Sequence, residues 1–324
     1  MKRKSVVAIS TLLIASSLLA SCGGGGEKVS FGEYWYKNSS VRAEVGAEEI
    51  LSYDVSFTPG SGISKNYELA YSNGEYSTSF KLVEENGKKF YRLSSTLTID
   101  VTYTFGGNDV TFTDTTSSLV EFEANTAFTP IKSEKHVVSH SPRKTNDSTE
   151  LSGCYDVFDY SATVVYNGAS GTSTVVNNTN NATKSNSFEL DDADDYTYID
   201  NEQLYFALRA LQPTARASTL LVYAPFSKVA QQISATFGSK VSNEKFKFVK
   251  NSETMPTDGY AVEYVPITIA LAEKNPGSPQ LIKVATTNDA DRNTNRNLIL
   301  EIQTPLAYNL GTLTYKLKSA KFFN

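Results

Sequence analysis

The two histidines of the chain, His136 and His140, are the first residues whose type and spacing suggest chemistry. Four residues apart on a helix, two imidazoles share one face and can bind a metal ion. Their segment, however, contains two valines and is bounded by Pro130 and Pro142, which is typical of a strand. On a strand the two side chains would stand about 13 Å apart, too far to share one zinc ion. We therefore expect a surface strand and no metal site here.

Carboxylates gather at two places where they could bind a cation. Residues 191–195 read Asp-Asp-Ala-Asp-Asp, and Asp289–Asn295 spaces side-chain oxygens at positions 1, 3, 5 and 7 of a calcium loop. The second segment has Thr294 where such a loop needs glycine, and Leu300 where it needs an acid. We expect a solvated turn there, and at 191–195 an acidic run that precedes a helix and favours its dipole. Calcium at either place stays open as an alternative.

The residues that could act as nucleophiles lack the partners that such chemistry needs. Cys154 has no histidine or cationic residue beside it in sequence, so we expect a small buried side chain rather than a catalytic thiol. The chain has no Gly-x-Ser-x-Gly elbow and no phosphate-binding loop. The sequence therefore predicts a protein that is not an enzyme and that uses no cofactor or metal.

The amino-acid composition excludes two further classes of protein, nucleic-acid binders and disordered chains. The chain has 324 residues, 30 Lys and Arg against 35 Asp and Glu, and a pI near 5.3. Such a chain lacks the basic face expected of a nucleic-acid binder. Its 19 Tyr, 17 Phe and 1 Trp are too many aromatic residues for a disordered chain. A globular body with no nucleic-acid partner follows.

The first 22 residues have the features of an export signal. Three basic residues at positions 2–4 precede an apolar run that ends at Leu19. The next residues complete Leu19-Ala20-Ser21-Cys22, which resembles the lipobox of bacterial lipoproteins. This resemblance implies a signal peptide at residues 1–21, cleavage before Cys22, and acylation of Cys22 so that the protein is anchored to a lipid bilayer.

The resemblance also fixes expectations about location and charge. Cleavage removes three of the 30 basic residues and no acid, which leaves 27 basic and 35 acidic residues and a formal charge of −8. Gly23 after the lipidated Cys22 implies the outer membrane in a host with two membranes, and the cell surface in a host with one. Residues 22–48 are expected to form a flexible tether, of which about ten residues reach on the order of 17 Å. Only Cys154 then remains as a free thiol, so no intrachain disulfide is expected.

The body must supply the elements that position these residues, and from residue 49 its apolar residues recur with a period of two. The pattern predicts strands at 50–57, 65–72, 75–83, 89–105, 109–114, 117–124, 130–140, 218–224, 245–249, 260–271, 280–286, 297–304 and 310–323. Hairpin turns are expected at Asn73-Gly74, Asn86-Gly87 and Gly106-Gly107.

Three segments of the body depart from the strand pattern. Residues 200–212 predict a helix with Asp200 as N-cap and Gln203 three residues later. The segment 142–187 contains one potential strand, 154–166, and its Asn/Ser/Thr-rich flanks indicate surface loops or an insertion. Residues 229–237 fit a helix and a strand equally well.

These elements predict a mainly β fold, a large curved antiparallel sheet, open and barrel-like, with one central helix. The body would occupy residues 49–324, with two β-sandwich-like halves, 49–187 and 188–324, as the alternative.

The order of these features resembles an exported bacterial family known as domain of unknown function 3108, whose members are similar to the curved sheet of the LolA/LolB lipoprotein carriers. The residues that carry this resemblance are Tyr53-Asp54-Val55, the helix 204–209, Lys283-Val284, the turn 288–292, and a last strand from Leu310-Gly311-Thr312-Leu313 to Leu317-Lys318-Ser319. The resemblance implies a fold and no particular reaction.

The aromatic residues are the remaining candidates for a function. They serve first as packing and cross-strand pairs, and a curved sheet would also expose some of them on its concave lining. The candidates for lining a ligand site are Tyr53, Phe57, Phe90, Tyr103, Tyr205 and Phe206. We expect a membrane-anchored, non-catalytic envelope lipoprotein that binds a lipid, a glycan or an envelope protein in the curved sheet. The alternative is a structural or adhesive surface lipoprotein without a pocket.

Overall fold

The structure is a computed structural model that describes residues 28–31, 45–62, 67–143, 150–211, 217–226, 230–251, 253–272, 278–286 and 297–323. The predicted signal peptide 1–21, the lipidation site Cys22 and the segment Asp289–Asn295 lie outside these residues.

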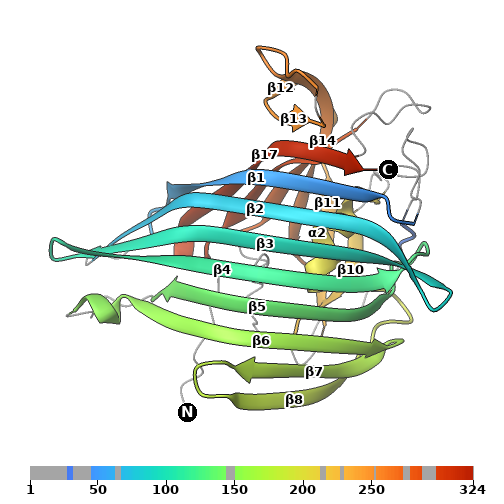
Figure 1. The fold of residues 1–324 in the computed structure, drawn as a ribbon, viewed down its shortest axis with the longest axis horizontal. Coiled ribbons are helices and arrows are strands. Elements are labelled where there is room, and N and C mark those ends of the chain that lie inside the picture. Colours follow the sequence, from blue (N-terminus) through green and yellow to red (C-terminus); the bar gives the residue numbers. More distant parts are fainter. Residues whose placement is uncertain are drawn as a thin grey trace.

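The first half of the body is a meander of eight antiparallel strands, each paired with the next (Figure 1). Alternation of side chains along the first five strands gives one buried and one more exposed face; on β3, for example, alternate residues from Leu93 to Tyr103 are buried. The strands are β1 (Glu48–Pro59), β2 (Glu68–Glu85), β3 (Lys88–Phe105), β4 (Asn108–Glu123), β5 (Pro130–Pro142), β6 (Tyr155–Asn167), β7 (Ser170–Asn177) and β8 (Ala182–Glu189).

The second half continues the same sheet. The last strand pairs antiparallel with β1 along its whole length, and the sheet then runs through β16, β15 and β14 to β11, β10 and β9. These strands are β9 (Thr197–Asp200), β10 (Ser218–Tyr223), β11 (Gln231–Phe237), β12 (Val241–Phe246), β13 (Val249–Lys250), β14 (Tyr260–Leu271), β15 (Gln280–Ala285), β16 (Ile299–Pro305) and β17 (Gly311–Phe323).

One curved sheet therefore runs through the whole body, and the architecture is the single sheet rather than the two sandwich-like halves. The sheet is not closed, because its end strands β8 and β9 pair only with β7 and β10. In Figure 1 the strands β1–β8 form a broad layer in front of β10, β11 and the short helix α2 (Leu204–Arg209). The main core lies between these layers. In the described part of the chain, no helix has the length and apolarity needed to cross a membrane.

The helix begins as the sequence predicts and ends earlier. Asp200 is the N-cap of the 3₁₀ turn that precedes the α-helix, and its carboxylate accepts a hydrogen bond from the Glu202 amide at 2.8 Å. One turn of 3₁₀ helix, η2 (Asn201–Gln203), leads into α2, which ends at Arg209 instead of residue 212. Two further 3₁₀ turns, η1 (Leu151–Gly153) and η3 (Ala307–Asn309), lie in connections between strands.

Two of the three predicted hairpin turns are confirmed. Asn86-Gly87 joins β2 to β3 and Gly106-Gly107 joins β3 to β4, and all four residues have positive φ. The prediction for Asn73-Gly74 is wrong, because β2 continues through it with a bulge between Ser72 and Glu75. At Gly74 a Cβ atom would lie 2.7 Å from the Cβ of Val55 on β1, so the glycine admits the close approach of the neighbouring strand.

The predicted surface loops in 142–187 are also wrong in part. Besides β6, the segment forms the hairpin of β7 and β8 at one end of the sheet. Most side chains of β8 are exposed on both faces, so the strand shows no apolar alternation. The ambiguous segment 229–237 forms strand β11.

The predicted tether is not free along its whole length. Val29 and Phe31 contact the body, and Phe31 is fully buried. Its ring stacks on Phe128, which lies in the connection between β4 and β5. The chain is therefore fixed to the body well before β1 begins at Glu48.

Candidate functional site

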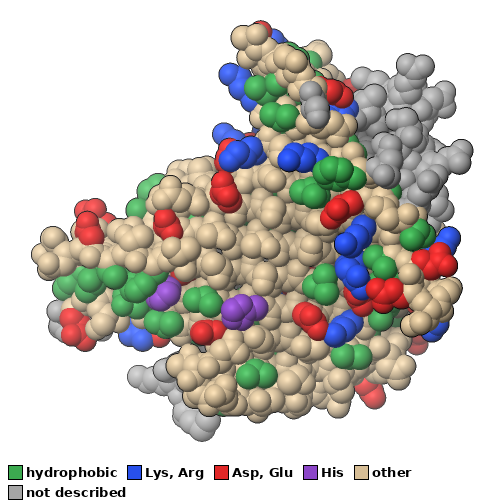
Figure 2. All heavy atoms as spheres, viewed as in Figure 1, with side chains coloured by type: hydrophobic (Ala, Val, Ile, Leu, Met, Phe, Trp, Pro, Cys, Tyr) green, Lys and Arg blue, Asp and Glu red, His purple; other side chains and the backbone are tan. Residues whose placement is uncertain are grey.

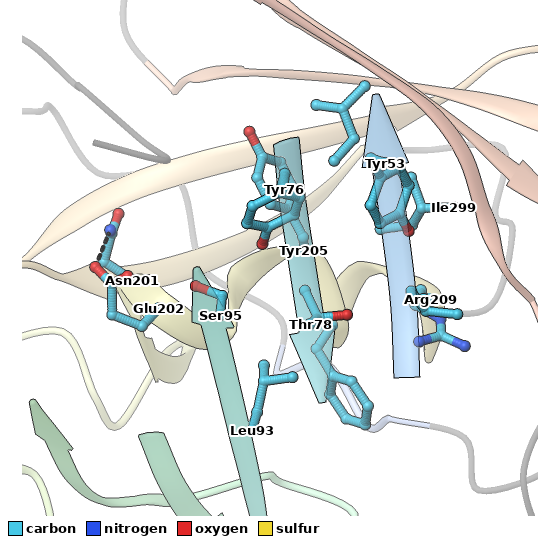
Figure 3. Close-up of a pocket in the computed structure, with 13 residues that line it drawn as sticks. Tyr53, Tyr76, Thr78, Leu93, Ser95, Asn201, Glu202, Tyr205, Arg209 and Ile299 are labelled. Atoms are coloured by element: carbon cyan, nitrogen blue, oxygen red, sulfur yellow. Dashed lines mark hydrogen bonds between the residues drawn. The ribbon is translucent and has the colours of Figure 1, made fainter. Parts of the chain in front are cut away.

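A small cavity lies between helix α2 and the concave side of the sheet (Figure 3). Its free volume is about 30 Å³, which is room for roughly two water molecules. Its walls are formed by Leu51, Tyr53, Tyr76, Thr78, Leu93 and Ser95 of β1–β3, Asn201, Glu202, Tyr205, Phe206 and Arg209 of η2 and α2, and Ile299 and Ile302 of β16. The cavity therefore lies where both halves of the sheet face the helix.

Three of the six aromatic residues predicted to line a ligand site meet at this cavity. They are Tyr53 from β1 and the neighbours Tyr205 and Phe206 from α2. Figure 3 shows Tyr53, Tyr76 and Tyr205 close together on one side of the cavity. Aromatic rings and hydroxyl groups thus border the same space, as amphipathic ligands require.

The other three predicted residues do not line the cavity. Phe57 packs edge-on against Tyr71, with ring centroids 5.0 Å apart. Tyr103 belongs to a separate group of tyrosines and contacts Tyr155 with ring centroids 5.1 Å apart. Phe90 lies beneath the guanidinium group of Arg92 near the β2–β3 turn. These three rings pack against neighbouring side chains, which is the first role that the sequence predicts for the aromatic residues.

The helix is fixed to the sheet by a cluster of aromatic rings around Phe206. The ring centroid of Phe206 lies 4.3 Å from that of Phe80, 5.4 Å from Phe122 and 5.7 Å from Phe128. All four residues are buried. Since a helix of six residues has little stability of its own, this packing is what holds it in place.

A buried ion pair holds the C-terminal end of α2. Arg209 donates hydrogen bonds to both carboxylate oxygens of Glu49, at 2.6 and 3.1 Å, and to the backbone oxygen of Asn297 at 2.9 Å. The side chains of Arg209 and Glu49 are only 3% and 2% exposed. A bidentate pair of this kind satisfies both charges away from water, and it links the helix to β1.

A second buried ion pair lies at the N-terminal end of the helix. Lys135 of β5 donates to Glu202 at 2.7 Å, and Asn201 donates to the same oxygen at 2.9 Å. Burial opposes ionisation of Glu202, but the charge and hydrogen bond of Lys135, together with hydrogen bonds from Asn201 and Ser118, outweigh it and lower the pKa of this carboxyl group. Glu202 and Arg209 both border the cavity and both are internally paired, so the site presents no uncompensated charge from them.

The capping residue Asp200 is a further buried carboxylate beside this pair. It is fully buried and accepts hydrogen bonds from Ser133 and Tyr166, both at 2.6 Å. Burial and the neighbouring negative charge of Glu202 raise the pKa of Asp200 to about 6. Asp200 and Glu202 are therefore two buried carboxyl groups whose pKa values are shifted in opposite directions.

The tyrosines that line the cavity are neutral hydrogen-bonding groups. Burial raises the pKa values of Tyr53, Tyr76 and Tyr205 above the ordinary value for tyrosine. Tyr205 donates a hydrogen bond to Gln280 of β15 at 2.7 Å, which ties α2 to the second half of the sheet. The site can therefore offer apolar ring faces and neutral phenols to a ligand.

The two histidines lie on β5, as the strand pattern predicts, and do not meet. His140 stacks on Phe112 with ring centroids 3.8 Å apart and shares a 2.8 Å hydrogen bond with Asp114. His136 lies 3.5 Å from a carboxylate oxygen of Asp159. Among the residues that the structure describes, no three His, Cys, Asp or Glu side chains are grouped so that they could hold a metal ion.

The remaining candidates for chemistry lie apart from the cavity. Cys154 is fully buried, and its thiol lies 3.8 Å from the backbone oxygen of Glu150. The acidic run 191–195 forms a turn between β8 and β9, in which Asp192 accepts a hydrogen bond from Gln232.

The sequence did not reveal the charged pairs that fix the helix. Glu49 and Arg209 are 160 residues apart, and Lys135 and Glu202 are 67 apart. The only local signal was a basic residue within the apolar segment 204–211. A charge in such a place is buried only with a partner, and the partner itself could not be named from sequence.

No family model, curated protein or solved structure matches the chain.

Proposed function

We propose that this protein is a non-catalytic lipoprotein of the bacterial cell envelope, anchored through acylated Cys22, which binds the apolar part of an amphipathic ligand between α2 and the sheet. The cavity beside α2 is the observation that carries the proposal. It is bordered by Tyr53, Tyr205 and Phe206 and by charges that are already paired. A ligand there gains apolar burial without having to neutralise a charge.

The size of the cavity decides how such a ligand enters. A volume of about 30 Å³ is too small for an acyl chain, so the helix must move away from the sheet to admit one. Helix α2 has six residues and depends on its packing, which makes it the element best suited to move. Lipids and lipid-linked glycans are the ligand classes that combine an apolar part with polar groups for the phenols.

A titration of residues 27–324 with a dansyl-labelled fatty acid tests this proposal. We expect saturable binding that weakens about tenfold in Thr78→Ile, roughly 1.4 kcal/mol, because the larger side chain fills the cavity. Thr96→Ile makes the same change on the exposed face of β3 and should leave binding unchanged. Equal binding by both variants would show that the probe binds elsewhere.

The anchor is tested separately, by metabolic labelling with palmitate. We expect the label on the wild-type chain and its loss in Cys22→Ser, together with release of the protein from the membrane fraction. A Cys22→Ser protein that stays labelled would contradict the anchor and leave the cavity proposal standing.

A structural or adhesive surface lipoprotein is the second candidate. The small volume of the cavity favours it, because buried side chains of the main core surround the cavity and leave little free space there. Absence of binding by any fatty-acid probe, with the fold intact, would favour this candidate.

A further inference from the structure

The segment that follows the predicted lipidation site is fixed to one end of the sheet. Val29 donates a backbone hydrogen bond to Thr197 of β9 at 2.9 Å and accepts one from the same hydroxyl at 2.6 Å. Two residues later, Phe31 donates from its backbone to the oxygen of Thr126 at 2.8 Å. Both contacts lie at the end of the sheet formed by β9 and the loop 124–129, which we call the anchored end.

Few residues separate this contact from the lipid anchor. Seven Cα-to-Cα steps lead from Cys22 to Val29, and a fully extended chain of that length spans at most about 25 Å. The anchored end therefore cannot lie farther than this from the acylated residue. This step rests on the lipid anchor of the proposed function.

The start of strand β4, at the other end of the molecule from the loop 124–129, lies much farther from the acylated residue. Strand β4 has 16 residues, so about 50 Å separate Glu123, next to the anchored end, from Asn108. The turn at Gly106-Gly107 lies at this far end, on the long hairpin of β3 and β4 in Figure 1. No part of the short linker reaches this hairpin.

The charge of the protein opposes a position flat on the membrane. The mature chain carries −8, and anionic lipids repel a body of that charge. On the outer face of β1–β8, Ser and Thr of neighbouring strands stand side by side, as in the row of Ser52, Ser77, Thr96 and Ser117. Figure 2 shows the middle of this face largely without hydrophobic side chains, so it offers little that would insert into lipid.

We infer that the anchored end, formed by β9 and the loop 124–129, is the surface that faces the lipid bilayer, and that the β3–β4 hairpin points away from it. Because η2 directly follows β9, the N-terminal side of the cavity then lies at the membrane-facing end.

Energy transfer from the full-length lipidated protein to a vesicle surface tests this orientation. A donor dye is placed on one of two exposed positions, by Ala127→Cys in the loop 124–129 that follows β4 or by Asn108→Cys at the start of β4. Cys154 is buried and Cys22 is acylated, so neither takes the dye. The vesicles contain phosphatidylcholine, phosphatidylglycerol and a headgroup-labelled acceptor lipid. We expect several-fold higher transfer efficiency from Ala127→Cys than from Asn108→Cys.

A linker variant makes the test specific for the short connection. Insertion of about ten Gly and Ser residues after Gly26 should lower the transfer from Ala127→Cys, because the anchored end can then move away. Equal transfer from both positions, or more from Asn108→Cys, overturns the orientation while the anchor stands. A full-length wild-type protein that carries no lipid on Cys22 and does not stay on the vesicles overturns the anchor, and the orientation with it.

Discussion

The ring of Phe31 lies flat on the ring of Phe128, with centroids 4.7 Å apart and planes inclined by 8°. Phe128 in turn contacts Phe206 of α2, and its backbone oxygen accepts a hydrogen bond from Gln203 at 2.7 Å. The segment around Phe31, which follows the proposed lipid anchor, and the helix beside the cavity therefore belong to one aromatic cluster. Release of the segment should loosen the helix.

Phe31→Ala tests this connection. Loss of a fully buried phenyl ring is expected to lower the free energy of unfolding by about 3 kcal/mol or more. It should also speed hydrogen exchange of the amides of residues 204–209, since Phe128 loses the ring stacked on it. Urea unfolding and hydrogen-exchange mass spectrometry measure the two effects.

Phe323→Ala is the matched control, because that ring is 47% exposed at the end of β17. Its effect on unfolding should stay within about 0.5 kcal/mol. If Phe31→Ala were as mild as this control, the segment would not be a part of the core.

A double-mutant cycle on Arg209 and Glu49 tests the buried ion pair. Arg209→Met should cost about 3–5 kcal/mol, because it leaves the carboxylate of Glu49 buried without its partner. Combined with Glu49→Leu, the loss should be clearly smaller than the sum of the two single losses. Additive losses in urea unfolding would mean that the two side chains do not act as a pair.

The stability of the protein should depend on Asp200 in the mildly acidic range. Its pKa is raised in the folded protein to about 6, so folding is favoured when the group is protonated. That contribution is complete below about pH 4 and is lost as the pH rises through 6, up to about 3 kcal/mol in total. Asp200→Asn should remove this dependence and gain stability relative to the wild type as the pH rises.

Urea unfolding at pH 4, 5, 6 and 7 measures the dependence on Asp200. Asp191→Asn, an exposed carboxyl group in the adjacent turn, is the control and should follow the wild-type profile. A constant difference between wild type and Asp200→Asn at every pH would show that Asp200 keeps an ordinary pKa.

The sequence predicted those parts of the fold that depend on local patterns. The alternation along β3 and the turn at Asn86-Gly87 are properties of neighbouring residues, and both were found. The turn expected at Asn73-Gly74 failed because the same dipeptide also forms a bulge, and Val55 of the neighbouring strand decides between the two. Strand β8 was missed because exposure on both faces leaves no alternation to detect.

The candidate site was predictable only in part, because it also depends on contacts between residues that are distant in the sequence. Tyr53, Tyr205 and Phe206 belong to a curved aromatic-rich sheet and its helix, and they do meet at the cavity. Phe57 and Tyr103 have the same residue types in the same kind of strand, but other tyrosines cover them. Which ring faces a cavity depends on contacts between distant strands, and a single sequence does not contain them.

Native mass spectrometry of residues 27–324, purified from a bacterial host, tests the central claim most directly. We predict that a lipid is retained at a ratio of one per chain, that Thr78→Ile loses it, and that Thr96→Ile keeps it. A wild-type protein that carries no lipid as purified, and that takes up none after incubation with lipid vesicles, would contradict the claim that the space between α2 and the sheet binds an amphipathic ligand.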